Sequence, residues 1–127
     1  IRMIYKEFPI LGNESLLASR FAISAKLLGG DEAYGPLHDA MMTMRANVSE
    51  ASLTSLADGL GLDGAAILAG MDDPAVDQII GANHSLAGRL QISGTPTFVT
   101  EGQLLRGYLP LDGMMQIVAE IRAQNAQ

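Results

Sequence analysis

Apolar residues recur along this chain at two different spacings, and the change of spacing predicts the order of the structural elements. The first eight residues, IRMIYKEF, are nearly continuously apolar or aromatic, which is typical of a strand covered on both faces. We therefore expect a buried strand over Ile1–Phe8, ended by Pro9. From about residue 13 to residue 90, apolar residues instead recur three or four positions apart, as they do on one face of a helix.

This middle region predicts a series of helices, because residues that favour helix ends interrupt its apolar stripes. Side chains of Asn, Ser and Asp accept hydrogen bonds from the first free N–H groups of a helix, and glycine closes many helices. The long last helix has an apolar face apart from Asn83, which we expect to form a hydrogen bond inside a helix–sheet interface. The expected starts are Asn13, Pro36, Ser49, Asp63 and Asp73-Pro74, and the expected ends are Gly29-Gly30, about Arg45, Gly61, Leu68 and about Leu90.

Two runs typical of strands, TPTFVT and QLLRGY, follow the helices, and Glu101-Gly102 between them predicts a tight hairpin. Pro96 opens the first run, and because proline has no backbone N–H it belongs at the start of a strand, at an edge or at a bulge. Asp112 is placed to cap a terminal helix. Three strands are few for a sheet of ordinary size, so we expect part of the sheet to be missing.

Composition narrows the classes of function. A chain of 127 residues with 48% hydrophobic content can form one compact core. Its 14 acidic and 8 basic residues give a net charge of −6, which argues against nucleic acid or an anionic membrane surface as partner. No apolar run approaches the roughly 20 residues of a membrane-spanning helix.

The absence of cysteine excludes several kinds of functional site from this chain. With no cysteine in the sequence, the chain has no disulfide, no thiolate nucleophile and no cysteine ligand for a metal. His38 and His84 stand far apart without the spacing of a metal site, and we expect both to pack rather than to catalyse. The sequence therefore predicts neither a metal nor a cofactor.

Five segments, read together, give the chain a family resemblance: KEFPILGNESLLASR, LHDAM, LADGLGLD, NHSLAGRLQISGTPTFV and LLRGYLPLDGM. In order and spacing they resemble the DsbA-like thiol:disulfide oxidoreductases of the cell envelope, from Ile1 to about Arg122. The resemblance implies an incomplete α/β thioredoxin-like fold made of a strand, a helical insertion, a β-hairpin and a terminal helix. It assigns residues 1–12 and 91–127 to the thioredoxin-like part and residues 13–90 to the insertion.

The resemblance also implies what is absent. In this family a strand and a Cys-X-X-Cys helix precede the region that matches Ile1, and that strand lies between those matching Ile1–Phe8 and Thr97–Thr100. We therefore expect this chain to be a portion of a longer protein and to be redox-inert alone. We also expect a homodimer or an exchanged element to complete the sheet, because exposed strand edges promote association.

The site residues follow from the same resemblance. Thr95-Pro96 matches the family's cis-proline loop, which offers backbone groups to an extended substrate peptide, and Gly94 would permit a close approach of that peptide. Sequence reasoning alone does not establish the cis bond, since only about 5–6% of X-Pro bonds are cis. Glu7, near the end of the expected first strand, is a candidate auxiliary acid that relays protons to the thiols of an intact protein.

The expected function is that of a portion of a protein thiol:disulfide oxidoreductase. Its substrates would be unfolded or cysteine-containing proteins of the bacterial periplasm or cell envelope. One alternative is a non-redox thioredoxin-like module that binds peptides without chemistry. Another is a relative of the kappa-type glutathione-dependent isomerases and transferases, which share a helical insertion and a PTF strand, although LRGYLPLDGM resembles the oxidoreductases more closely.

Overall fold

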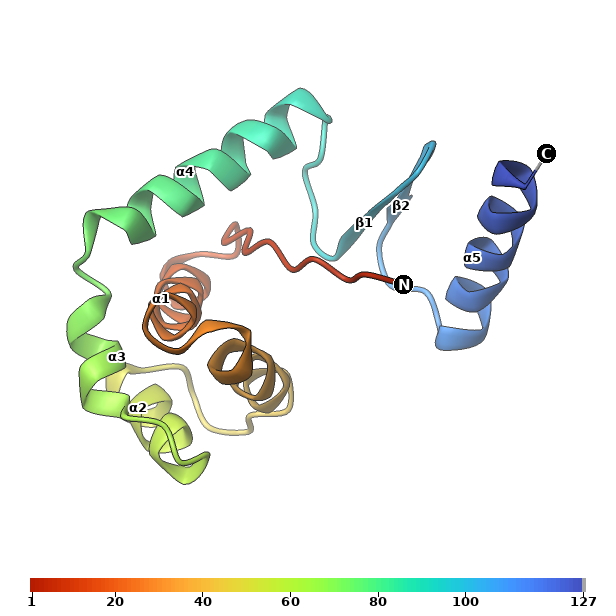
Figure 1. Cartoon of the computed structure of the whole chain (residues 1–127). Helices are drawn as coiled ribbons and strands as arrows, with labels where there is room; N and C mark the ends of the chain where they lie inside the picture. The colour runs from red at the N-terminus through yellow and green to blue at the C-terminus, as the bar shows by residue number, and fades with distance from the viewer. Residues whose placement is uncertain (127) are drawn as a thin grey trace. The chain divides into compact units, whose positions relative to one another are not determined.

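The computed structural model describes residues 1–126, which form two compact units. The first unit is Ile1–Ala87 and the second begins at Gly88. The elements follow one another as four helices, two strands and a fifth helix, labelled α1–α4, β1, β2 and α5 in Figure 1. The assignment of residues 1–12 and 91–127 to one domain stays a prediction.

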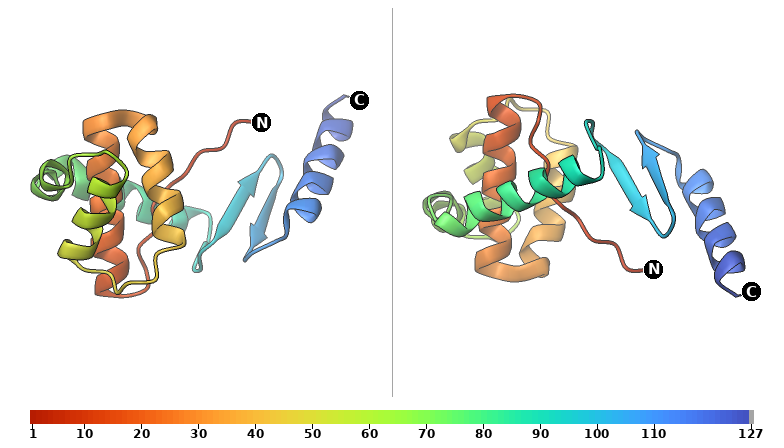
Figure 2. Two further views of the ribbon diagram at one scale, coloured as in Figure 1. Left: turned by 90° about the horizontal axis from the view of Figure 1, so that it is seen from below. Right: turned by 90° about the horizontal axis from the view of Figure 1, so that it is seen from above.

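The strand expected over Ile1–Phe8 is wrong. Residues 1–10 have no regular secondary structure and run as an extended coil in both views of Figure 2. Ile1 and Ile4 expose 78% and 60% of their surface. A strand needs a neighbouring strand to satisfy its N–H and C=O groups, and among residues 1–126 the sheet contains only β1 and β2. The apolar pattern is present, but the described part of the chain offers it no partner strand.

Helix α1 (Asn13–Met42) consists of two helical segments that meet at Gly30. Gly30 has φ 68° and ψ −162°, a conformation that side-chain-bearing residues rarely adopt, so the break predicted at Gly29-Gly30 is confirmed. The second segment begins earlier than Pro36, which lies inside the helix. Asn13 is not the cap, because Gly12 occupies the N-cap position and no side chain caps the helix.

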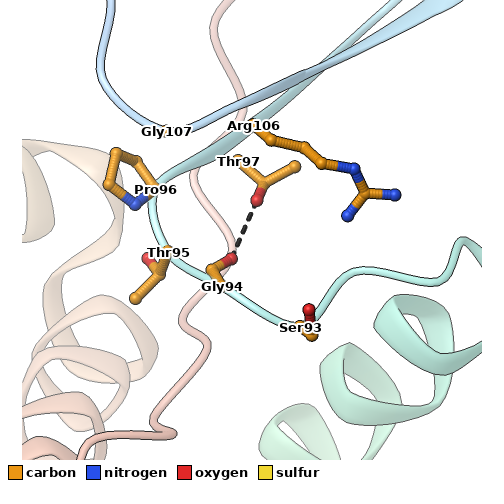
Figure 3. A pocket seen from close by; sticks show the side chains of 7 residues that line it. All are labelled: Ser93, Gly94, Thr95, Pro96, Thr97, Arg106 and Gly107. Carbon is orange, nitrogen blue, oxygen red and sulfur yellow. Dashed lines mark hydrogen bonds between the residues drawn. The ribbon is translucent and has the colours of Figure 1, made fainter.

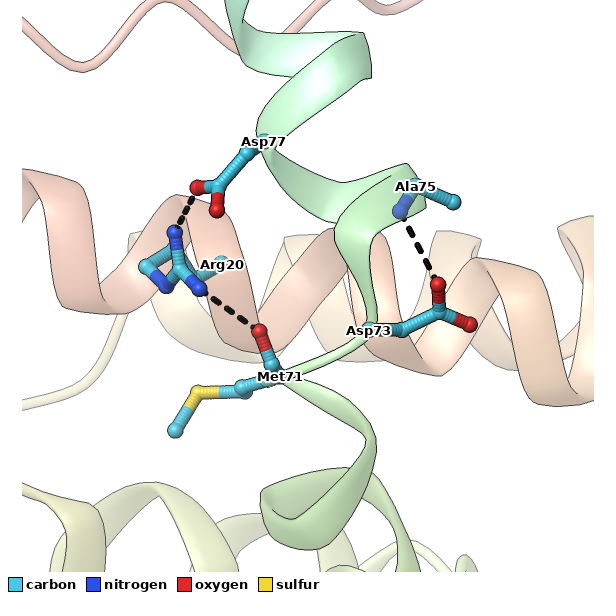
Figure 4. Close-up of polar contacts among 5 residues, drawn as sticks. All are labelled: Arg20, Met71, Asp73, Ala75 and Asp77. Atoms are coloured by element: carbon cyan, nitrogen blue, oxygen red, sulfur yellow. Dashed lines mark hydrogen bonds and ion pairs between the residues drawn. The ribbon is translucent and has the colours of Figure 1, made fainter.

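Three further helices start where the sequence predicted: α2 (Glu50–Gly59), α3 (Gly64–Gly70) and α4 (Pro74–Arg89). Ser49 and Ser52 form a reciprocal capping box at the start of α2. Asp63 accepts a hydrogen bond from the N–H of Ala66, and Asp73 accepts one from the N–H of Ala75 (Figure 4). These caps satisfy N–H groups that a helix start otherwise leaves without partners.

The core of the first unit lies where α1, α2 and α3 pack against one another, an arrangement visible in Figure 2. Phe21, Leu37 and Leu53 are fully buried in it. Arg20 links α1 to the end of α3 and to the first turn of α4: its Nη2 donates to the carbonyl of Met71 at 2.7 Å, and its Nη1 pairs with Asp77 (Figure 4). The remaining buried members of this main cluster are Ala25, Ala57, Ile67 and Met71.

The second unit contains the predicted hairpin. Strands β1 (Thr97–Thr100) and β2 (Gln103–Arg106) are antiparallel, with Thr97 opposite Arg106 and Thr100 opposite Gln103. Gly102 in the turn has φ 88°, which glycine adopts without strain. Helix α5 (Leu111–Asn125) follows, and its N-cap is Pro110 rather than the expected Asp112. No residue of α5 is buried.

Candidate functional site

A pocket of about 210 Å³ lies where the chain enters β1 and leaves β2, in the second unit. Gly94, Thr95 and Pro96, the three residues predicted to bind substrate, all contribute to it (Figure 3). The structure therefore brings these residues together in one concave surface. The other lining residues are Ser93, Thr97, Arg106 and Gly107.

The loop is held by short contacts within the unit. The Thr95-Pro96 peptide bond is cis. The hydroxyl of Thr97 donates to the carbonyl of Gly94 at 2.8 Å, drawn as a dashed line in Figure 3, and the N–H of Gly107 donates to the carbonyl of Pro96 at 2.9 Å. A Cβ at Gly94 would meet no atom within 4 Å, so no contact in the described chain requires glycine there.

The register of the hairpin shows which backbone groups of β1 remain open. Because Gly107 donates to Pro96, the neighbouring pair Thr97 and Arg106 does not exchange backbone hydrogen bonds, whereas Phe98 and Leu105 do. The N–H and C=O groups of Thr97 and Val99 consequently point away from β2. This outer edge of β1 has the alternating donors and acceptors that an added strand requires.

Glu7 belongs to the first unit, where its carboxylate is the centre of a polar cluster. The hydroxyl of Ser19 donates to Oε2 at 3.1 Å and the hydroxyl of Tyr34 donates to Oε1 at 2.9 Å. Asn83 donates its side-chain N–H to the main-chain carbonyl of Glu7 at 2.9 Å. Burial, and next the charge of Glu7, raises the pKa of the Tyr34 phenol well above its ordinary value.

Sequence reasoning identified two members of this cluster and missed two. Asn83 interrupts an otherwise apolar helix face and was expected to form an interface hydrogen bond, but its partner is the coil at Glu7 rather than a sheet. Ser19 and Tyr34 gave no comparable signal, because serine and tyrosine are common on helices. Their separations from Glu7, 12 and 27 residues, become contacts only in the folded chain.

The two histidines contact aromatic rings. The ring centroid of His38 lies 4.6 Å from that of Tyr5, and the ring centroid of His84 lies 5.0 Å from that of Phe8.

Within residues 1–126 no three His, Asp or Glu side chains form a group that could hold a metal ion. None of the helices in that range combines the length and the apolar character needed to cross a membrane.

Comparison with known proteins decides the family. The model of the DSBA-like thioredoxin domain matches residues 1–119. The chain belongs to this DSBA-like family. It therefore has the thioredoxin-like DsbA fold, so the predicted fold class is confirmed even though its first expected strand is not formed here. A comparison with curated protein sequences gives no significant match.

Solved structures of the same fold resemble this DSBA-like chain over most of its length. A thioredoxin-like oxidoreductase from Silicibacter pomeroyi is 33% identical with a TM-score of 0.84, the match covering 94% of this chain and 67% of the other. The thiol-disulfide exchange protein alpha-DsbA2 from Wolbachia pipientis is 28% identical with a TM-score of 0.84, covering 93% and 64%.

A third solved structure extends the likeness in fold. A periplasmic thioredoxin-like protein from Salmonella enterica serovar Typhimurium is 24% identical with a TM-score of 0.75, and the match covers 91% of this chain and 63% of the other. The DSBA-like chain thus spans between 63% and 67% of the length of the three solved proteins.

Proposed function

We propose that this chain is the substrate-docking portion of a protein thiol:disulfide oxidoreductase, in which Gly94, Thr95 and Pro96 bind an extended segment of the client protein. The observation that carries this proposal is the pocket at the entry to β1, which apart from Arg106 is lined by glycine, serine, threonine and proline. Main-chain recognition depends little on client sequence, which suits an enzyme that acts on many unfolded proteins. Clients would be cysteine-containing proteins of the bacterial periplasm or cell envelope.

The redox step itself needs groups from outside these 127 residues. In thiol–disulfide exchange, a thiolate attacks one sulfur of a disulfide, forms a mixed disulfide and releases the other sulfur as a thiolate. A second thiolate then resolves the mixed disulfide, so two electrons pass between the cysteine pair of the enzyme and the cysteine pair of the client. Because this chain has no cysteine, we propose that a Cys-X-X-Cys pair on further polypeptide supplies both thiols and that this chain alone is redox-inert.

The absence of a side chain at Gly94 supports docking at this loop. Space is free around its Cα, so a peptide backbone can approach closely, and each main-chain hydrogen bond to that peptide contributes about 1 kcal/mol net. Gly94→Leu should fill this space without a clash inside the protein and should weaken binding. The matched control is Gly88→Leu, at an exposed position on α4 that lines no part of the pocket and where a Cβ also meets open space.

The test measures binding of fluorescent, cysteine-free extended peptides to the full chain by anisotropy. Binding that is weakened at least about tenfold by Gly94→Leu, corresponding to about 1.4 kcal/mol, and unchanged by Gly88→Leu supports the proposal. Circular dichroism of each variant shows whether the fold is retained. Equal binding by both variants and the unsubstituted chain would place the peptide elsewhere and reject the docking role of the loop.

A non-redox peptide-binding module is the second candidate, favoured by the same lack of cysteine. The two functions differ in what the native polypeptide contains. The intact mass and amino-terminal sequence of the protein in its cell distinguish them: an upstream Cys-X-X-Cys pair supports the oxidoreductase, and its absence supports the binding module.

We further propose that the outer edge of β1 is covered by another strand. In the complete oxidoreductase this would be the strand leading to the cysteines; in the isolated chain, a second copy or an exchanged element would take its place. The open groups of Thr97 and Val99, and the exposed Val99 side chain, support pairing there. Light scattering should give a mass of twice 13.4 kDa, and a stable monomer would reject the exchange.

For Glu7 we propose the auxiliary role of an acid that relays protons to the thiols of the complete oxidoreductase. The support is its position beside two hydroxyls, Tyr34 and Ser19, which can pass a proton along a chain of hydrogen bonds. The test is the pH dependence of exchange in the complete protein. Glu7→Gln should flatten that dependence, whereas an unchanged pH profile would restrict Glu7 to anchoring the N-terminal coil.

A further inference from the structure

Arg106 is the only charged residue among the described residues that line the pocket at the entry to β1. The other lining residues are serine, glycine, threonine and proline, whose side chains carry no charge at neutral pH. A single guanidinium among neutral groups makes the electrostatic character of this pocket positive. This is unexpected in a chain whose net charge is −6.

The hairpin register determines where this charge lies. Arg106 is directly opposite Thr97 in a pair that exchanges no backbone hydrogen bonds, so the two side chains lie on the same face of the hairpin. Thr97 in turn bonds to the carbonyl of Gly94. Figure 3 shows the guanidinium of Arg106 extending beside Thr97, on the side of the loop where Ser93 lies.

The guanidinium is oriented and still has donors to offer. Its Nη1 donates to the main-chain carbonyl of Gln91 at 2.9 Å, which fixes the group against the segment before the loop. A guanidinium has five N–H donors in a rigid fork, so several are left for a ligand. No acidic side chain within residues 88–126 forms an ion pair with Arg106.

We propose that Arg106 makes this site selective for extended peptides that carry a carboxylate next to the segment docked at Thr95-Pro96. The inference rests on the proposed docking of peptides and names a preference within it. A planar carboxylate matches the guanidinium fork and can accept two parallel N–H bonds. The carboxylate is either an aspartate or glutamate side chain beside the docked segment or the terminal carboxylate of the peptide.

The experiment compares three cysteine-free fluorescent peptides of one length with the full chain. The first has asparagine beside the docked segment and an amidated end, the second has aspartate in place of that asparagine, and the third keeps asparagine but has a free terminal carboxylate. Exposed ion pairs are weak, so we expect a gain of about two- to fivefold in affinity for a carboxylate peptide. The gain should shrink at high salt.

Substitutions then assign the gain to Arg106. Arg106→Gln should bring the affinity ratio of carboxylate to neutral peptide close to one, and Arg106→Lys should give an intermediate ratio because it keeps charge but loses the fork. Arg122→Gln, on α5 in the same unit, changes the net charge identically without altering the pocket lining and should keep the full ratio.

The outcomes separate this inference from the function on which it rests. Preference for the second peptide identifies an acidic side chain as the ligand, and preference for the third identifies a chain terminus. Equal affinity for all three peptides, or a preference that survives Arg106→Gln, overturns the selectivity but leaves peptide docking standing. Failure of every peptide to bind overturns both.

Discussion

Replacing Tyr34 by phenylalanine tests the Glu7 cluster through a pH-dependent change in stability. Tyr34 is 5% exposed and its hydroxyl donates to the Glu7 carboxylate at 2.9 Å. A hydrogen bond to a charged group contributes about 1.5–3 kcal/mol, and because Glu7 is only half-buried we expect a loss near 1.5 kcal/mol at neutral pH. For a unit of this size, each kcal/mol lowers the melting temperature by about 4–8 °C.

The stability lost in Tyr34→Phe should become smaller at alkaline pH because the pKa of Tyr34 is raised in the folded protein. Above the ordinary tyrosine pKa of about 10, the unfolded chain loses the phenol proton while the folded chain keeps it. The folded state then binds more protons, so the free energy of unfolding falls as pH rises, by at most about 1.4 kcal/mol per pH unit. Tyr34→Phe removes this contribution, so the stability gap between the two proteins should narrow above pH 10.

The assay is denaturant unfolding followed by helical circular dichroism at several pH values between neutral and strongly alkaline. Tyr108→Phe is the matched control, because Tyr108 is 80% exposed. It should leave both the stability and its pH dependence unchanged relative to the parent. A gap between parent and Tyr34→Phe that stays constant through the alkaline range would refute the account of burial and of the Glu7 charge.

Two further substitutions test how the first unit is held together. Arg20→Met should cost about 1–2 kcal/mol in denaturant unfolding, because it removes the bond to the main chain at the end of α3 and the pair with Asp77. Lys26→Met, which loses an exposed ion pair with Asp31 and a cation–π contact with the Tyr34 ring, should cost less than about 1 kcal/mol; equal losses would contradict this. Gly70→Ala should lower the melting temperature, because the new Cβ would lie 2.5 Å from the buried hydroxyl of Ser24. Gly59→Ala, with open space around the new Cβ, should instead raise the free energy of unfolding by about 0.4–1 kcal/mol. An unchanged melting temperature in Gly70→Ala would show that the Ser24 side chain moves aside without cost.

Elements defined by local contacts could be predicted from the sequence. Ser49, Asp63 and Asp73 cap helices through atoms two or three residues away, so their signals are complete within a short window. The hairpin turn at Glu101-Gly102 is local in the same way. The prediction that Asn13 caps the first helix was wrong for an equally local reason, since the preceding residue, Gly12, occupies the N-cap position.

Elements that depend on distant partners could not be predicted this way. Ile1–Phe8 has the composition of a buried strand, but strand formation depends on a neighbour, and residues 1–126 do not provide one. In the candidate site, the loop at Thr95-Pro96 was predicted through the family resemblance, and its docking role stays a prediction. Arg106 was missed because only the register of the hairpin places it beside the loop. Tyr34 was missed because its bond to Glu7 spans 27 residues.

The position of Arg106 has a consequence for how such a chain could discriminate between clients. In the proposed docking at Thr95-Pro96, the main chain would supply affinity that is nearly independent of client sequence, because every peptide carries the same N–H and C=O groups. Any preference would then come from side chains at the rim, and among the described lining residues Arg106 is the one that carries a charge. A weak, salt-sensitive contact of the kind proposed for Arg106 would shift the order in which clients bind without excluding any of them. Strong selectivity would instead require a buried, fully desolvated partner, which the exposed Arg106 does not provide.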